Sequence, residues 1–195
     1  MPAAARPRLK PGKVYRTKDL ARYGKNTPRL AKRLVAEGQL RPLAHGLFVH
    51  PEKSKFGSVP PNSEELMRGY LNRGRFIFSG PRQWNALGLG STALFASQLV
   101  YNDVRTGEVE LGGRRFTLRR VAFPNSPTAE YYAVDLIKNH RKAGISLRRI
   151  EEKLGRAIAR RRFEPTRLRQ IAKRYGTRSA ETVVENAIVA AEEVV

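Results

Sequence analysis

Cationic side chains crowd one short segment of the chain and are spaced for a common ligand. Arg29, Lys32 and Arg33 stand three and four positions apart, directly after the pair Thr27 and Pro28. In a helix, at about 100° per residue, this spacing places the three cations on one side. Guanidinium forks and ammonium groups bind phosphate oxygens and the O6 and N7 acceptors of guanine. The pattern therefore predicts contact with nucleic acid.

A helix over residues 28–37 must carry these cations. We expect Thr27 to be its N-cap, Pro28 to occupy its first position and Gly38 to stop it. The side of this helix opposite the cations is apolar and predicts a packed face, formed by Leu30, Ala31, Leu34 and Val35.

A second, shorter helix is predicted just upstream. Residues 14–16 are typical of a short strand. Thr17 is a typical N-cap, and we expect it to begin a helix over 18–23 that Gly24 ends in the left-handed conformation. Two short helices joined by a turn that contains glycine form the helix-turn-helix pattern, whose second helix enters the major groove. Lys18 and Lys25 are further cations that this helix and turn present to DNA.

A hairpin is predicted directly after the cationic helix. Strands over 40–43 and 47–49 flank a turn in which Gly46 takes the left-handed conformation, and Pro42 restricts the first strand to a sheet edge. A hairpin in this place is a wing, and we expect Arg41 and His45 at its tip to reach phosphate or the minor groove. Residues 13–51 are thus predicted to form a winged helix-turn-helix DNA-binding domain.

The distribution of charge indicates how the rest of the chain is organised. The 195 residues carry a formal net charge of +21, and a polyanionic partner is the simplest reason for a charge so unfavourable to a compact fold. Residues 1–60 contribute +11, residues 61–135 only +2 and residues 136–195 +8. We expect a basic arm over 1–12, the winged domain over 13–51, a Pro- and Ser-containing linker over 52–62 and a C-terminal domain over 63–195.

The C-terminal domain is predicted to be α+β, with a small antiparallel sheet followed by a helical bundle. Its clearest signal is a hairpin around Gly112 and Gly113, in which apolar and charged residues alternate on both arms. Helices are predicted over 63–71, 81–87, 131–139, 146–159, 164–174 and 179–193. In the 146–159 helix, four aliphatic residues recur at three- and four-residue steps and should face the core: Leu147, Ile150, Leu154 and Ile158.

The sequence offers no pattern for catalysis, metal binding or a cofactor. It contains no cysteine, and His45, His50 and His140 lack metal-ligand spacing. Glu108 and Glu110 share one face of a predicted strand, where arginines on the opposite strand are the expected partners. No signal peptide or membrane span is evident, so we expect a cytoplasmic protein that is not an enzyme, has no metal site and does not bind membranes.

The order and spacing of four segments resemble the AbiEi-type antitoxins of type IV toxin–antitoxin systems. These segments cover residues 14–20 with 34–40 and 46–51, residues 79–89, residues 98–101 with the Gly112–Gly113 hairpin, and residues 168–176. The resemblance implies a winged-helix domain that binds and represses its own promoter, and a C-terminal domain with an antitoxin role. It also implies a nucleotidyltransferase-like toxin as partner, with the recognition-helix role falling to Thr27, Arg29, Lys32 and Arg33, and the wing role to Arg41 and His45.

One departure from the resemblance and three alternatives remain open. Residues 1–12 contain three prolines and cannot form the helix that normally begins a winged domain. Either that helix is lost, or residues 63–71 pack in its place. The basic arm over 1–12 could also lie along DNA. Three other kinds of protein would share the same composition. They are a stand-alone DNA-binding regulator without a toxin, a basic protein that binds tRNA or rRNA, and a protein-interaction module whose charge serves solubility.

Overall fold

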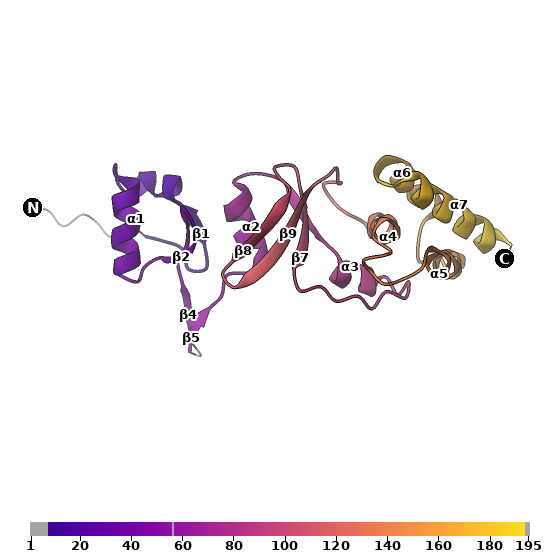
Figure 1. Cartoon of the computed structure of the whole chain (residues 1–195), viewed down its shortest axis with the longest axis horizontal. Helices are drawn as coiled ribbons and strands as arrows, with labels where there is room; N and C mark the ends of the chain where they lie inside the picture. Colours follow the sequence, from indigo (N-terminus) through magenta and orange to yellow (C-terminus); the bar gives the residue numbers. More distant parts are fainter. Residues whose placement is uncertain (1–7, 56, 194–195) are drawn as a thin grey trace, which may run out of the picture. The chain divides into compact units, whose positions relative to one another are not determined.

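The computed structural model describes residues 8–55 and 57–193 and has the predicted α+β class, with small antiparallel sheets and several helices (Figure 1). Its contacts define two compact units, unit 1 of Met1–Phe76 with Glu108–Phe116 and unit 2 of Ile77–Gly107 with Thr117–Val195. These limits differ from the predicted domain boundary near residue 62. Most of the predicted basic arm, residues 1–7, lies outside the described residues.

Unit 1 is organised by a three-stranded antiparallel sheet with strand order β1-β3-β2. The strands are β1 (Val14–Arg16), β2 (Arg41–Ala44) and β3 (Leu47–Val49). Pro42 lies in the edge strand β2, as predicted, because a residue without an N–H is tolerated at the edge of a sheet and not in its centre. Gly46 turns the hairpin with a φ of +66°, also as predicted, because glycine adopts the left-handed region without steric cost.

The two predicted helices of unit 1 are present, with corrections at their ends. The first is a 3₁₀ helix, η1 (Thr17–Tyr23), and the second is α1 (Thr27–Ala36). The N-cap of α1 is Asn26 and not Thr27: its side-chain oxygen accepts the Arg29 N–H at 3.1 Å. Gly24 has a φ of 170° and is extended, so the predicted left-handed end is wrong there, whereas Gly38 stops α1 at a φ of +69° as predicted.

Apolar residues from both helices and the sheet close the core of unit 1. Its centre is Leu20 and Leu34, each with no exposed surface, and Tyr15, which is 2 % exposed. Leu30, Ala31 and Leu40 complete the buried set, and Val35 packs against it. The apolar side of α1 is therefore the packed side, as its sequence period predicts.

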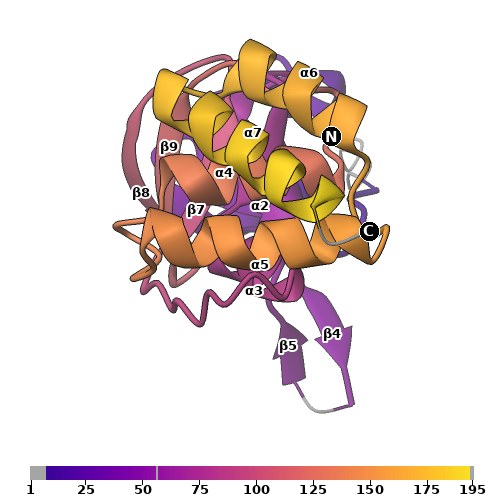
Figure 2. The same cartoon turned by 90° about the vertical axis from the view of Figure 1, so that its right-hand side faces the viewer.

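The predicted linker over 52–62 is not irregular. Its first part forms a second antiparallel hairpin of β4 (Glu52–Ser54) and β5 (Gly57–Val59), with Glu52 opposite Val59. Every residue of both strands is exposed, and Figure 2 shows the pair as a two-stranded arm. Its three-residue strands are too short and too polar to give a strand signal in the sequence.

Helix α2 (Ser63–Leu71) packs directly against β1. The Glu65 carboxylate accepts the Val14 N–H at 3.1 Å, and the Arg16 guanidinium donates to the Gly69 carbonyl at 3.0 Å. A Cβ added at Gly69 would lie 2.3 Å from Cγ1 of Val14. The helix therefore needs a glycine where its backbone meets the strand, and it belongs to unit 1 and not to the C-terminal domain.

The remaining strands form a four-stranded sheet of order β6-β7-β9-β8. They are β6 (Phe76–Ser79), β7 (Gln98–Asn102), β8 (Gly107–Leu111) and β9 (Arg114–Arg120). The β8–β9 turn is Gly112–Gly113 with φ values of +58° and +77°, which confirms the predicted hairpin.

Unit 2 contains five helices among the described residues: α3 (Pro81–Ala86), α4 (Ala129–Lys138), α5 (Leu147–Ala159), α6 (Pro165–Tyr175) and α7 (Arg178–Glu192). These bounds agree with the predicted helices to within two residues at each end. Ile150 and Leu154 have no exposed surface and Ile158 is 7 % exposed, so the predicted core stripe of α5 is confirmed. Helix α5 packs chiefly on α7 (Figure 2).

A buried carboxylate lies at the centre of unit 2. Asp135, which is 2 % exposed, accepts hydrogen bonds from the Ser79 hydroxyl, the Trp84 indole N–H at 2.9 Å, the Tyr101 hydroxyl at 2.8 Å and the Asn139 amide at 3.1 Å. Burial, and then the nearby Asp135 charge, raise the pKa of Tyr101 far above its usual value. The phenol therefore stays a donor, and the polar groups of this cluster satisfy one another.

None of the helices in residues 8–55 and 57–193 has both the length and the apolar composition needed to cross a lipid bilayer.

Candidate nucleic-acid interface

One face of α1 gathers the predicted DNA-contacting cations. Arg29, Lys32 and Arg33 are all exposed, whereas Leu30 and Leu34 on the opposite face are 7 % and 0 % exposed. The helix is held by its apolar side, so the cationic side is presented to solvent as a set on a rigid element. Sites built on helices position their side chains better than sites on loops.

The three cations of α1 are not equally free to meet a ligand. Arg33 lies 3.6 Å from the Glu37 carboxylate one helical turn on, and both side chains are about half exposed. Among the described residues, Arg29 and Lys32 have no ion-pair partner. A phosphate or base would therefore compete with Glu37 for Arg33 alone.

The N-terminal end of α1 adds oriented backbone donors to this face. Thr27 is half-buried as the first residue of the helix, next to the Asn26 cap. The first turn of a helix has N–H groups without intrahelical acceptors and the positive end of the helix dipole, which together favour an anion. Lys25, in the turn before α1, and Lys18, in η1, are both exposed.

The two predicted wing residues lie at opposite ends of the β2–β3 hairpin. His45 is exposed in the two-residue turn, as predicted. Arg41 is the first residue of β2 and pairs with Val49, at the end of the hairpin away from the turn. The expectation that Arg41 lies at the tip is therefore wrong, because the first strand begins at Arg41 and runs toward the turn.

A feature missed in the sequence is the exposed β4–β5 hairpin, which brings a further cation, Lys53, into unit 1. Alternation of apolar and polar residues, the usual strand signal, is absent because both faces of this hairpin meet solvent.

A buried phenol ties the described end of the basic arm to the sheet. The Tyr15 hydroxyl accepts the Lys10 N–H at 2.8 Å, and the Tyr23 hydroxyl donates to the Arg8 carbonyl at 3.2 Å. Burial raises the pKa of Tyr15, partly opposed by the Lys10 hydrogen bond. Residues 8–12 thus lie against unit 1 and do not extend freely from it.

Glu108 and Glu110 are exposed on β8, and no ion pair links them to the opposite strand within the described part of the chain. The cross-strand pairs expected there are therefore not formed. No group of three or more His, Asp or Glu side chains in residues 8–55 and 57–193 is arranged to hold a metal ion.

Comparison with known proteins gives a fold relative and no family. No family model matches the sequence, and no curated protein matches it. Among solved structures, the crystal structure of the Rv2827c protein from Mycobacterium tuberculosis superimposes with a TM-score of 0.57 at 12 % sequence identity, covering 92 % of this chain and 72 % of that one. At this identity the likeness establishes a shared fold alone.

Proposed function

We propose that this protein is a DNA-binding transcriptional regulator and that unit 1 is a winged helix-turn-helix whose recognition helix is α1. The observation that carries the proposal is the division of α1 into a buried apolar side and an exposed side bearing Arg29, Lys32 and Arg33. A helix anchored in this way can enter a major groove without losing its packing. The net charge of +21 supplies the nonspecific attraction that DNA-binding proteins use.

The elements around α1 support the same proposal. A short helix and a turn precede it, an antiparallel hairpin follows it, and a third strand completes the sheet. Helix α2 packs on β1, where it would take the part of the supporting helix that the three prolines of residues 1–12 are expected to prevent. The wing contact falls to His45, at the hairpin turn, while Arg41 would contact phosphate from the other end of β2.

A salt-series competition assay tests the proposal. The full chain is titrated onto labelled duplex from its own upstream region, with unlabelled upstream duplex, random duplex and tRNA as competitors. We expect the upstream duplex to compete best, and log K to fall linearly with log salt. Equal competition by random duplex would remove the regulator assignment, and stronger competition by tRNA would make the protein an RNA binder.

We further propose, on the family resemblance, that the protein serves as the autoregulating antitoxin of a type IV system with a nucleotidyltransferase-like toxin as partner. Its test is independent of DNA binding: a nucleotidyltransferase gene adjacent to this one is cloned, and growth arrest by its product is measured with and without this chain. Growth arrest that this chain does not relieve, or the absence of such a neighbour, would leave a stand-alone regulator.

A further inference from the structure

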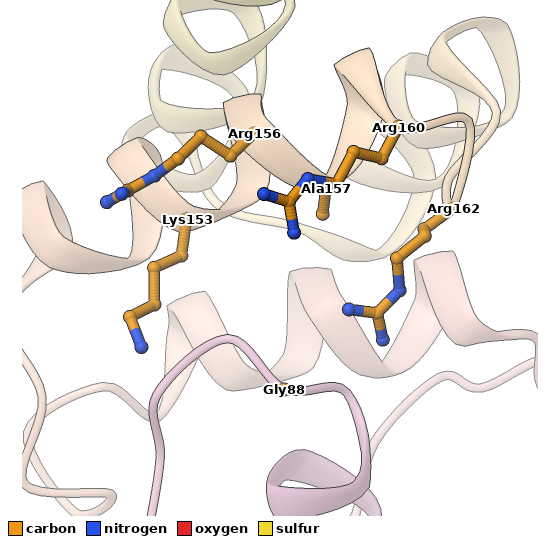
Figure 3. A pocket seen from close by; sticks show the side chains of 6 residues that line it. All are labelled: Gly88, Lys153, Arg156, Ala157, Arg160 and Arg162. Carbon is orange, nitrogen blue, oxygen red and sulfur yellow. The ribbon is translucent and has the colours of Figure 1, made fainter.

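A hollow in unit 2 is lined almost entirely by cations. Lys153 and Arg156 reach it from α5, Arg160 from the C-cap of α5, Arg162 from the turn that follows, and Gly88 from the loop after α3 (Figure 3). Its volume is about 190 Å³, and Ala157 is the only other lining residue. In Figure 3 the Lys153, Arg160 and Arg162 side chains extend from the α5 side toward the loop that carries Gly88.

The charge in this hollow is not neutralised by the protein. Of the residues in 8–55 and 57–193, none that lines the hollow is acidic. Arg162 donates to the Leu87 carbonyl at 3.1 Å and Arg156 to the Glu152 backbone carbonyl at 3.3 Å, so both bind neutral acceptors. Within the described residues, Lys153 and Arg160 have no hydrogen-bond or ion-pair partner.

Two glycines let these cations approach the 88–90 loop closely. A Cβ at Gly90 would lie 3.0 Å from the Lys153 ammonium nitrogen, and one at Gly88 would lie 3.5 Å from the Arg162 guanidinium. Both glycines have positive φ values, +68° at Gly88 and +92° at Gly90, which other residues rarely adopt. The Lys153 and Arg162 side chains therefore occupy space beside the loop that a side chain at 88 or 90 would take.

The physical balance of the hollow favours an anion of the phosphate class. Like charges brought together repel, and the C-terminal end of α5, whose dipole is negative, offsets only part of that cost. Guanidinium forks bind phosphate oxygens in pairs, and an ammonium group adds a point charge. An apolar ligand could contact the Ala157 methyl group and the methylene stems of the lining lysine and arginines, but it would leave their charged ends unpaired.

We propose that this hollow is a phosphate-binding site, separate from the cationic face of α1 and independent of the function proposed for unit 1. It holds either a free phosphate-class ligand or a phosphate of a nucleic-acid backbone, with Lys153, Arg160 and Arg162 as its principal ligands. Unit 2 thereby has a binding site of its own for a phosphorylated ligand.

Titration of the full chain with inorganic pyrophosphate and, separately, with a short random duplex tests the site. Calorimetry at constant ionic strength compares the wild type with K153Q/R160Q and with R149Q/K173Q, a control that removes one lysine and one arginine exposed outside the hollow. We expect K153Q/R160Q to bind pyrophosphate about tenfold more weakly or worse, and the control to stay within about twofold of wild type. The variant K153R/R160K, which keeps both charges, should retain most of the affinity.

Each outcome decides the proposal. Selective loss of pyrophosphate binding in K153Q/R160Q supports a site for a free phosphate-class ligand. Selective loss on the duplex alone assigns the site to backbone phosphates. Equal behaviour of K153Q/R160Q and R149Q/K173Q with both ligands overturns the proposal, whether or not α1 binds DNA. The altered side chains lie at the surface or half-buried, so unfolding does not confound the result, and far-UV circular dichroism verifies this.

Discussion

Replacing Arg29 with alanine is the sharpest perturbation of the proposed DNA-contacting helix. The guanidinium is exposed on α1 and has no ion pair among the described residues, so it gives up no partner when it binds. A bidentate arginine–guanine contact discriminates by about 1–3 kcal/mol, which is about a 5- to 150-fold change in affinity. We expect Arg29→Ala to weaken binding to the upstream duplex within this range, and binding to random duplex by less.

Arg33 should behave differently for a reason visible in the structure. It must release Glu37, 3.6 Å away, before it can bind DNA, and an exposed pair of this kind is worth about 0.2–1 kcal/mol. The cost of Arg33→Ala should therefore be smaller than that of Arg29→Ala by up to this amount. Glu37→Gln should strengthen binding, because it frees Arg33 and removes a negative charge from the face.

Fluorescence anisotropy on the upstream and random duplexes over a salt series measures these effects. Arg178→Ala is the matched control, since Arg178 is an exposed arginine in the first turn of α7 in unit 2. Equal losses on both duplexes would reassign Arg29 to phosphate. A loss no greater than that of the control would refute α1 as the recognition helix.

Three further predictions concern stability. Gly69→Ala should destabilise the chain by about 1–3 kcal/mol in urea unfolding, because the new Cβ overlaps Val14, and the cost should be smaller in a Val14→Ala background, where the Cγ1 overlap is gone and the 2.8 Å approach to the Val14 Cβ remains; an undiminished cost there would contradict the overlap. Asp135→Ala should cost at least about 3 kcal/mol by the same assay, since it leaves the buried Ser79, Trp84 and Tyr101 donors without their acceptor, and a cost under about 1 kcal/mol would mean that they find other acceptors. Two hydrogen bonds from Arg169, each at 2.9 Å, hold the pKa of the Glu185 carboxyl below its ordinary 4.5. The pair therefore stabilises the fold above pH 4.5, and its contribution is lost as the pH falls through the lower pKa of the folded state. A double-mutant cycle of thermal melts at about pH 7 and about pH 3 should show the coupling only at the higher pH.

Local chemistry made much of the fold predictable. The helices of unit 2 follow from 3.6-residue apolar periods, and local capping chemistry sets several helix starts. The predicted first residues Ser146 and Glu164 are the N-caps of α5 and α6, and Asn62, one residue before the predicted start at 63, caps α2 in unit 1. The Gly112–Gly113 hairpin follows from alternation around a two-glycine turn. Such signals depend on neighbours within a few residues, and the sequence contains them in full.

Contacts between distant segments could not be predicted in the same way. The packing of α2 on β1 depends on residues 51 to 54 positions apart and redraws the boundary of the N-terminal unit. The position of Arg41, by contrast, already follows from the predicted bounds of the hairpin, because a strand over 40–43 that leads into the turn places Arg41 near its start.

By itself, the sequence determined that the protein is strongly basic, α+β in class, and equipped with an amphipathic helix whose cations face away from its apolar stripe, because charge and periodicity are properties of the chain. Only the tertiary structure decided that Lys153, Arg160 and Arg162 surround one hollow opposite Gly88. In the sequence, Lys153 and Arg160 have the spacing of an ordinary solvated helix face, and the loop that carries Gly88, which lies opposite them in Figure 3, is some 65 residues or more earlier in the chain. A binding site is a property of surfaces that folding brings together, and the spacing of residues along the chain does not record it.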